Sequence, residues 1–488
     1  MWSSNGFAPR VSDERAYLLQ AEIFANGKWS LPARPMPEFF EQEHIFVTPF
    51  VAGKYPPGHS ILLVPGIWIH WPPLVPLILA SFAGGLMFVL CRELSNGSVA
   101  LLAWSLWITM TPNLGALASY FSETTTLVLW LLGWLALLKR HRDGSGRWVI
   151  VAMVCAAWMM ITRPLTGIAY GIPTGLTLLH IEYQRREWRP LLMGALLVAV
   201  VAAIVPVWSM QTLGSWTPTP YQQWSRVYTP YDKLGFGLDS SPPLRAFPPD
   251  LANDYARFRE LHRNHTADPL PSVLRDRIFW IVEGVWPNRR LILLLPFVIG
   301  LASLSLETLL GPIGVLALIG AYLVFPHPRY MLLYYAEIFP VLAFVAAIGI
   351  QRIIDVLSRK IAKRPSIVSP ITATVAFLVL LASPRLVKSF REQESWKPDP
   401  IRELIAAIPT PRNIVFVRYP MATESPFLTV ANGPFLERER NVVVFDRGPA
   451  ENKQLAALFP NRKTYLLTVE DYGKARLTDY ADQLPRLK

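Results

Sequence analysis

Two polar groups of opposite charge bracket the first soluble stretch of this chain, residues 12–60. Asp13 and Glu14 stand near its start, and Lys54 precedes the rigid turn Tyr55-Pro56-Pro57-Gly58-His59 near its end. A carboxylate can act as a general base that takes the proton of an attacking hydroxyl or amine. A lysine ammonium can stabilise the developing charge of a phosphate leaving group. The residue types therefore indicate an acid–base site built by one loop.

The adjacent carboxylates also have a structural interpretation. At the start of a helix, Ser12 or Asp13 could accept hydrogen bonds from free backbone N–H groups. Of two neighbouring helical residues, only one can point into a given cleft. We predict Asp13 as the general base and keep Glu14 as the alternative.

Further cations stand at predicted helix ends. Arg163 lies in Thr162-Arg163-Pro164, where one helix stops and the next begins, and Arg329 and Tyr330 follow His327-Pro328. For each arginine alone, a side chain reaching to the membrane surface is the simpler interpretation. Several cations converging on one site would instead suit a phosphate or pyrophosphate group.

Four residues have less direct interpretations. Glu123 follows Ser122, so capping by the serine competes with contact to a substrate hydroxyl. His59 and His327 are too far apart in sequence to be argued as metal ligands, and we predict acceptor or supporting roles for both, as for Tyr55. No cofactor is predicted, and the sequence gives no argument for a divalent metal.

The composition indicates the surroundings of this site. The chain of 488 residues is 52% hydrophobic and only 17% charged, with a net charge of +12. Soluble proteins carry about 25% charged residues, so the deficit indicates a membrane protein. The basic residues form short clusters between apolar runs, which disfavours nucleic-acid binding. Cys91 and Cys155 lie inside apolar runs, so we expect buried thiols.

The fold class we predict is a polytopic α-helical membrane protein of about ten transmembrane helices. The expected spans are Pro72–Cys91, Val99–Met110, Thr124–Leu138, Trp148–Ile161, Leu165–Leu179, Leu191–Met210, Leu291–Leu306, Gly311–Phe325, Met331–Ile350 and Ile367–Ala382. The earlier Ile61–Ile69 is broken by Pro and Trp, so we expect it to lie at the membrane interface with Trp68 and Trp71 at headgroup level.

Three basic connections set the expected orientation. They lie at 139–147, 185–189 and 352–364, after the third, fifth and ninth expected spans, and therefore on one side. The positive-inside rule makes that side cytoplasmic. The first loop, the loop 211–290, the turn 327–329 and the C-terminal part would then share the exterior face. Because this places the N-terminus outside, we expect one further helix upstream of Met1.

Two soluble pieces complete the chain. In the loop 211–290, the Asp250–Arg263 part has helical spacing and is predicted as either a lid over a cavity or a packed cap. From Asn413 onward, Ile414–Val417, Val442–Phe445 and Tyr465–Thr468 are typical of buried strands, with Arg402–Ile408 and Asn452–Phe459 as helices. We predict three parts: 1–71 with the site motifs, 72–384 as the transmembrane domain including the exterior loop 211–290, and 385–488 as a small exterior α/β domain that packs on or orients the membrane part.

Four short motifs of the sequence resemble those of a known family. They are Asp13-Glu14-Arg15-Ala16-Tyr17, Asn26-Gly27-Lys28-Trp29-Ser30-Leu31-Pro32, Lys54-Tyr55-Pro56-Pro57 and Pro328-Arg329-Tyr330-Met331-Leu332. Together they resemble the GT-C membrane glycosyltransferases, and within them the branch of the protein O-mannosyltransferases and lipid A aminoarabinose transferases. The likeness in order and topology covers roughly residues 10–350.

The resemblance implies transfer of a sugar from a polyprenyl-phosphate donor to an acceptor at the outer face. The family's general base, acting with inversion at the sugar, falls on Asp13. Its donor-phosphate contacts fall on Lys54, Arg329 and Tyr330, and less directly on Arg15 and Arg163. Two departures are that the family's first membrane helix is not in the chain and that Tyr55 and His59 replace less polar neighbours.

The partners implied are a polyprenyl-phosphate sugar donor, membrane lipids and an acceptor that is a lipid, a glycan or a protein, without nucleic acid. The expected location is the inner (plasma) membrane, multi-pass, with the site and the C-terminal domain on the periplasmic side. Two alternatives remain at this stage: a transporter or flippase of a lipid-linked solute, and an inactive GT-C-like scaffold. A transporter would show charges at the bilayer midplane and two related halves, whereas the charges here cluster at helix ends.

Overall fold

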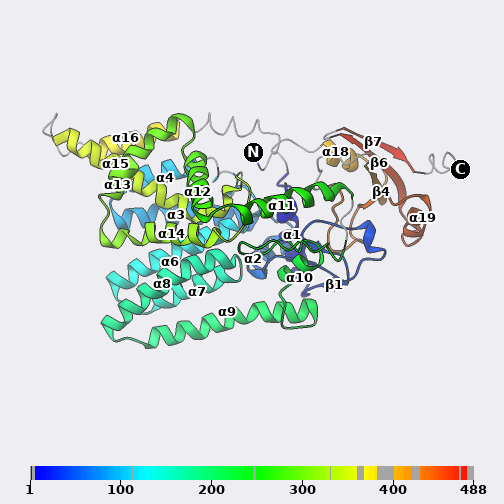
Figure 1. Cartoon of the computed structure of the whole chain (residues 1–488), viewed down its shortest axis with the longest axis horizontal. Coiled ribbons are helices and arrows are strands. Elements are labelled where there is room, and N and C mark those ends of the chain that lie inside the picture. Colours follow the sequence, from blue (N-terminus) through cyan, green and yellow to red (C-terminus); the bar gives the residue numbers. More distant parts are fainter. Residues whose placement is uncertain are drawn as a thin grey trace.

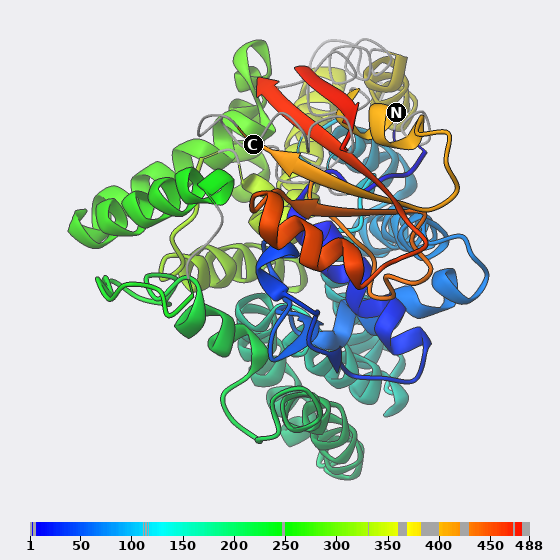
Figure 2. The same ribbon diagram turned by 90° about the vertical axis from the view of Figure 1, so that its right-hand side faces the viewer.

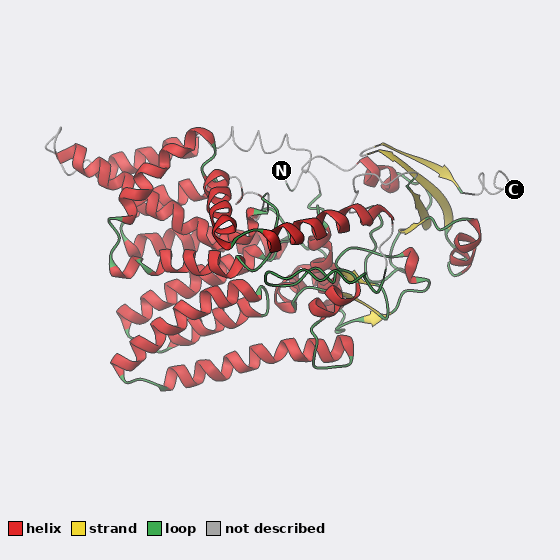
Figure 3. Cartoon of the chain, in the orientation of Figure 1, coloured by secondary structure: helices red, strands yellow, loops and turns green. Residues whose placement is uncertain are grey.

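The structure is a computed structural model of the chain, shown in Figure 1. It describes residues 6–110, 117–245, 249–329, 331–359, 368–381, 400–419, 429–471 and 474–480, together with the single positions 2, 112 and 115. Most of the described chain is helical, and the strands gather at the end opposite the helical bundle (Figure 3).

Apolar helices form the bundle. They are α3 (Leu74–Leu94), α4 (Gly97–Ile108), α6 (Glu123–Asp143), α7 (Arg147–Met160), α8 (Pro164–Arg185), α9 (Arg189–Leu213), α13 (Leu294–Leu301), α14 (Leu310–Tyr322), α15 (Phe339–Leu357) and α16 (Val368–Leu381). The short 3₁₀ helices η3 (Asn288–Leu293), η4 (Leu306–Thr308) and η5 (Leu332–Ile338) lead into α13, α14 and α15. Each of the ten segments predicted as spans therefore contains a helix.

Three of these helices are long and apolar enough to cross a membrane within the described residues. They are Leu74–Leu94, Arg189–Leu213 and the continuous Leu332–Leu357 formed by η5 and α15. The first two bury only a small share of their residues inside the protein, and Figure 1 shows α9 along one edge of the bundle. Long apolar helices whose large side chains face outward are typical of helices in contact with lipid.

The first soluble stretch folds against the end of the bundle. Helix α1 (Ser12–Ala25) is followed by η2 (Pro37–Phe39) and by a small antiparallel sheet in the order β1 (Leu31–Pro32), β3 (Phe50–Gly53), β2 (Ile45–Phe46). Buried side chains of α1 pack on this sheet, among them Ala16, Leu19 and Ile23. Helix α2 (Pro57–Trp68) then begins with Pro57 at its first position, where proline's missing N–H costs no helical bond.

The segment between α9 and α13 contains three helices: α10 (Pro220–Val227), α11 (Pro249–Ala267) and α12 (Leu270–Val285). Helix α11 contains the predicted Asp250–Arg263. Helix α10 packs on the first stretch through Trp224 and Tyr228, whose rings are buried against Phe46. The segment therefore covers part of the first stretch.

The C-terminal part is a four-stranded sheet in the order β5 (Asn441–Phe445), β4 (Asn413–Arg418), β6 (Lys463–Asp471), β7 (Lys474–Asp479). Strand β4 pairs in parallel with β5 and β6, while β7 is antiparallel to β6. Helices α18 (Pro400–Ala406) and α19 (Pro449–Ala457) accompany it. The three predicted strands are confirmed, and both predicted helices overlap α18 and α19.

This sheet packs on the first soluble stretch (Figure 2). Successive residues of β4 point to opposite faces, so Ile414 and Phe416 join one cluster and Val415 and Val417 another. The first cluster also contains three buried residues of the first stretch, Phe39, Phe40 and Val47. One face of the sheet therefore shares a core with the loop that carries Asp13 and Lys54.

Candidate active site

The two adjacent carboxylates of α1 face different surroundings. Glu14 is fully buried, and its oxygens accept hydrogen bonds from the backbone N–H groups of Arg10 (2.5 Å), Val11 (3.3 Å) and Tyr120 (2.9 Å). The helix-capping role expected of Ser12 or Asp13 thus falls to Glu14, which reaches back to the N-cap residue Val11. Burial raises the pKa of this carboxyl. Glu14 ties α1 to the segment before α6 and is a structural anchor.

Asp13 is partly open. About a quarter of its side chain is exposed (27%), and its Oδ1 accepts a hydrogen bond from the Tyr55 hydroxyl at 2.5 Å. On the other side, His44 Nε2 lies 3.8 Å from Asp13 Oδ2 and 3.7 Å from Glu43 Oε1. Burial, and then the charge of Lys54, hold the pKa of His44 well below its usual value, so the ring is neutral. Asp13 is therefore a carboxylate held by one phenol donor, with an uncharged imidazole nearby.

Tyr55 contacts both Asp13 and Lys54. Its pKa lies well above the usual value because of burial first and the charge of Asp13 second, so the phenol keeps its proton and remains a donor. The Lys54 ammonium lies 5.2 Å from the centroid of the same ring. The tyrosine predicted for the acceptor side is thus the residue that connects the two ends of the predicted site.

Lys54 is enclosed by aromatic rings and one carboxylate. It is only 4% exposed, and its Nζ lies 4.9 Å from the ring centroid of Tyr221 and 5.8 Å from that of Trp224, both on α10. Asp232 Oδ2 lies 3.9 Å from Nζ. Aromatic faces stabilise a desolvated ammonium by cation–π attraction. Lys54 is therefore a buried cation whose surroundings come from the segment after α9.

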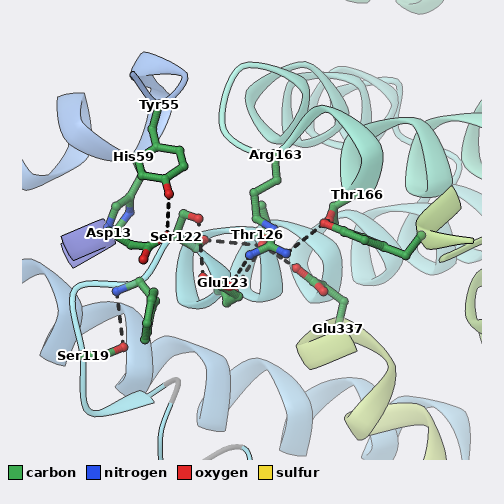
Figure 4. Close-up of polar contacts among 12 residues, drawn as sticks. Asp13, Tyr55, His59, Ser119, Ser122, Glu123, Thr126, Arg163, Thr166 and Glu337 are labelled. Atoms are coloured by element: carbon green, nitrogen blue, oxygen red, sulfur yellow. Dashed lines mark hydrogen bonds and ion pairs between the residues drawn. The ribbon is translucent and has the colours of Figure 1, made fainter. Parts of the chain in front are cut away.

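A second polar group, around Arg163, lies next to Asp13 and Tyr55 (Figure 4). Arg163, the residue before α8, forms an ion pair with Glu123 at the start of α6, and both side chains are buried. Arg163 Nη2 also donates to the Tyr322 hydroxyl at 2.8 Å, and Glu337 accepts from the Thr126 hydroxyl. Arg163 and Glu123 are thus brought together, but each already has a charged partner.

The remaining contacts show how this group connects to α1. Ser122 Oγ accepts from the Tyr17 hydroxyl at 3.0 Å and makes no capping bond, so the first of the two interpretations of Glu123, capping by Ser122, is wrong. His59 is buried: its Nε2 lies 2.8 Å from the Tyr120 carbonyl oxygen and its Nδ1 2.9 Å from Thr125 Oγ1. Because a carbonyl only accepts, Nε2 carries the proton. His59 fixes α2 to α6 and is a supporting residue rather than a surface one.

Three other predicted site residues have partners of their own, and a fourth lies outside the described residues. Arg329 is more than half exposed and pairs with Glu283 of α12. His327 is buried, with Nε2 2.9 Å from the Tyr335 hydroxyl. Arg15 acts electrostatically on Glu439 of the C-terminal part: its charge lowers the pKa of that carboxyl, which burial raises overall. Tyr330 lies outside the described residues.

Sequence reasoning missed six residues that surround this site, one in the first loop and five in other segments: His44, Tyr221, Trp224, Asp232, Tyr322 and Glu337. One signal was available for His44, which follows a carboxylate in Glu41-Gln42-Glu43-His44 within the same loop. Across the described ranges, no group of three or more His, Cys, Asp or Glu side chains is arranged to hold a metal ion.

Together the helical bundle and the soluble cover at its end have the architecture of the GT-C membrane glycosyltransferases. The structure is similar to ArnT from Cupriavidus metallidurans in the apo state, with a TM-score of 0.53 and 13% identity over 97% of this chain and 89% of that one. The same protein bound to undecaprenyl phosphate gives a TM-score of 0.48, at 13% identity over 100% of this chain and 88% of that one. An oligosaccharyltransferase from Archaeoglobus fulgidus in the apo form also gives 0.48, at 14% identity over 96% and 67%.

No family model and no curated protein matches the sequence. The similarity to ArnT shows a GT-C fold, which was expected from the short motifs of the first loop and of residues 328–332.

Proposed function

We propose that this chain is a membrane glycosyltransferase that moves a sugar from a polyprenyl-phosphate donor to an acceptor at the outer face of the membrane. One observation carries the proposal: Tyr55 donates to Asp13 while its ring lies against the Lys54 ammonium. A base and a phosphate-binding cation are thereby held on two sides of one rigid side chain. The GT-C fold supports the same assignment.

The reaction divides between the two groups. Asp13 takes the proton of the acceptor hydroxyl or amine, whose freed electron pair attacks the anomeric carbon of the sugar. The bond from that carbon to the phosphate oxygen breaks, its electron pair stays with the phosphate, and polyprenyl phosphate leaves. Lys54 stabilises the charge that develops on this oxygen. Attack opposite the leaving group inverts the anomeric configuration.

The surroundings of each group suit its role. Tyr55 orients Asp13 through its hydrogen bond, and neither Tyr55 nor the nearby His44 neutralises the carboxylate, because both are uncharged. Lys54 is removed from water, which strengthens its attraction for an anion. Arg163, Arg329, Tyr330 and Arg15 remain proposed contacts of the donor phosphate, and Glu123 a proposed contact of the acceptor. The three basic connections of the bundle support placing this site on the exterior side.

The test is transfer by the purified full chain in lipid nanodiscs, with polyprenyl-phosphate sugars as donors. In the variant Asp13→Asn, turnover should fall by about 10²- to 10⁴-fold, the usual contribution of a general base, while binding of undecaprenyl phosphate is kept. Glu260→Gln, an exposed carboxylate of α11 paired with Arg263, is the matched control and should keep parental turnover. If Asp13→Asn transfers sugar as fast as the parent protein, Asp13 is not the base.

A further inference from the structure

Lys54 has an anionic partner that the site, as proposed, does not need. Asp232 follows α10 and places Oδ2 3.9 Å from Lys54 Nζ, the one described carboxylate within 4.0 Å of that nitrogen. A cation that is 4% exposed and otherwise faces rings is costly unless an anion is close to it. Asp232 supplies that anion when no substrate is bound.

The carboxylate is held from two helices. The Tyr221 hydroxyl of α10 donates to Asp232 Oδ2 at 3.2 Å, and His262 Nε2 of α11 lies 3.6 Å from Oδ1. Burial raises the pKa of Asp232, but the contact with His262 and the charge of Lys54 outweigh it and lower that pKa. Asp232 is thus ionised, and it fixes the stretch 220–232 over Lys54.

A donor phosphate would need the same position. A phosphate and a carboxylate repel each other when they share one buried ammonium. We infer that Asp232 occupies the place at Lys54 that the donor phosphate takes, so that the stretch 220–232 is a gate which the donor displaces when it binds. The inference rests on the proposed function.

Its consequence is a lower affinity for the donor than Lys54 alone would give. Each donor that binds must first break the contact between Asp232 and Lys54, and the cost of that step is subtracted from binding. Removal of the charge at position 232 should therefore strengthen binding, although it removes an ion pair from the protein. A merely structural role for Asp232 predicts the opposite sign.

The experiment is a double-mutant cycle with the full chain in nanodiscs and undecaprenyl phosphate as the probe, measured by calorimetry. Asp232→Asn keeps an acceptor for the Tyr221 hydroxyl. It should bind the probe at least about fivefold more tightly, which corresponds to a coupling free energy of about 1 kcal/mol or more between Asp232 and the bound phosphate. The matched control Asp239→Asn removes a carboxylate of the same segment, paired with Lys233, and should bind as the parent does. In a Lys54→Gln background, Asp232→Asn should have no effect.

The outcomes separate the two proposals. If Lys54→Gln leaves binding unchanged, the phosphate site of the proposed function is wrong, and the gate is wrong with it. If Lys54→Gln weakens binding but Asp232→Asn fails to strengthen it, the gate alone is overturned. If Asp232→Asn does not fold, the parent protein can be tested by trypsin cleavage after Lys233, whose side chain is half exposed. Undecaprenyl phosphate should accelerate this cleavage. An unchanged cleavage rate overturns the gate.

Discussion

At the scale of single residues, neighbouring carboxylates of one helix have different chemistry because their neighbours differ. Glu14 accepts three backbone N–H groups and is fully buried, whereas Asp13 keeps an exposed edge and a phenol donor. The sequence placed both acids at the start of a helix, but only contacts with distant segments distinguish them. A sequence pattern cannot show that the backbone N–H of Tyr120 points at Glu14.

This difference predicts the effect of Glu14→Gln. An amide keeps one acceptor oxygen and turns the other into a donor that faces N–H groups, so buried donors lose their partner at about 1–3 kcal/mol. We expect a lower melting temperature, measured by intrinsic tryptophan fluorescence, with turnover per folded molecule close to the parent. A loss of turnover in fully folded Glu14→Gln, comparable with that of Asp13→Asn, would contradict the anchor role.

The cations show the same limit of sequence reasoning. Lys54 and Asp13 lie in one loop, so motif and spacing were enough to predict that they act together. Arg163 was also predicted, but its buried ion pair with Glu123 was not, since nothing local in either segment indicates the other. Arg329 was expected with them and pairs with Glu283 instead.

At the scale of elements, the helices were predictable and their contacts were not. Long apolar runs bounded by charges or proline mark helices directly, which is why every expected span contains one. The sheet of the first stretch was missed because strands of two to four residues are too short to show an alternating pattern. The role proposed for the stretch 220–232 follows only from the contacts that Asp232 and the rings of α10 make with Lys54.

One close contact between elements gives a further prediction. Gly58, near the start of α2, lies where an added Cβ would approach Thr162 Oγ1 to 2.4 Å and the Ile161 carbonyl oxygen to 2.8 Å. Gly58→Ala should therefore push α2 away from the residues next to Arg163, at a cost of about 1–3 kcal/mol for overpacking. We expect a lower melting temperature and a reduced turnover.

Gly97, at the start of α4, is the matched control because an added Cβ there meets nothing within 4 Å. Gly97→Ala should melt at or above the parental temperature with parental turnover. Equal behaviour of the two variants would show that α2 does not need this close approach.

At the scale of the whole molecule, the C-terminal sheet is coupled to the helix that carries Asp13. Its face shares a core with Phe39 and Phe40, Arg34 Nη2 donates to the Gly433 carbonyl oxygen at 2.6 Å, and Arg438 donates to Asn26 at the end of α1. The sequence predicted that this part packs on or orients the membrane part, because it contains no motif for chemistry of its own. In the structure its sheet packs on the first soluble stretch, a contact that the sequence did not indicate.

An acidic pair at this contact makes its stability depend on pH. Glu22 of α1 faces Glu439 and Arg438, and burial first and the charge of Glu439 second raise the pKa of Glu22 to about 7, while Arg438 lowers it. The folded protein thus holds a proton that the unfolded chain releases near pH 4.5, the usual value for glutamate. Folding is then favoured at low pH, and this contribution is lost as the pH rises through about 7.

The melting temperature of the parent should therefore fall between pH 5.5 and pH 8, and the fall should be smaller in Glu22→Gln, which has no proton to lose at this position. Burial also raises the pKa of Glu439, so part of the slope should remain in the variant. Glu260→Gln, which lies on α11, should keep the parental slope. A parental slope in Glu22→Gln would show that the contact between α1 and the C-terminal sheet does not titrate through this carboxyl, and that the sheet orients α1 through its apolar core and its arginines alone.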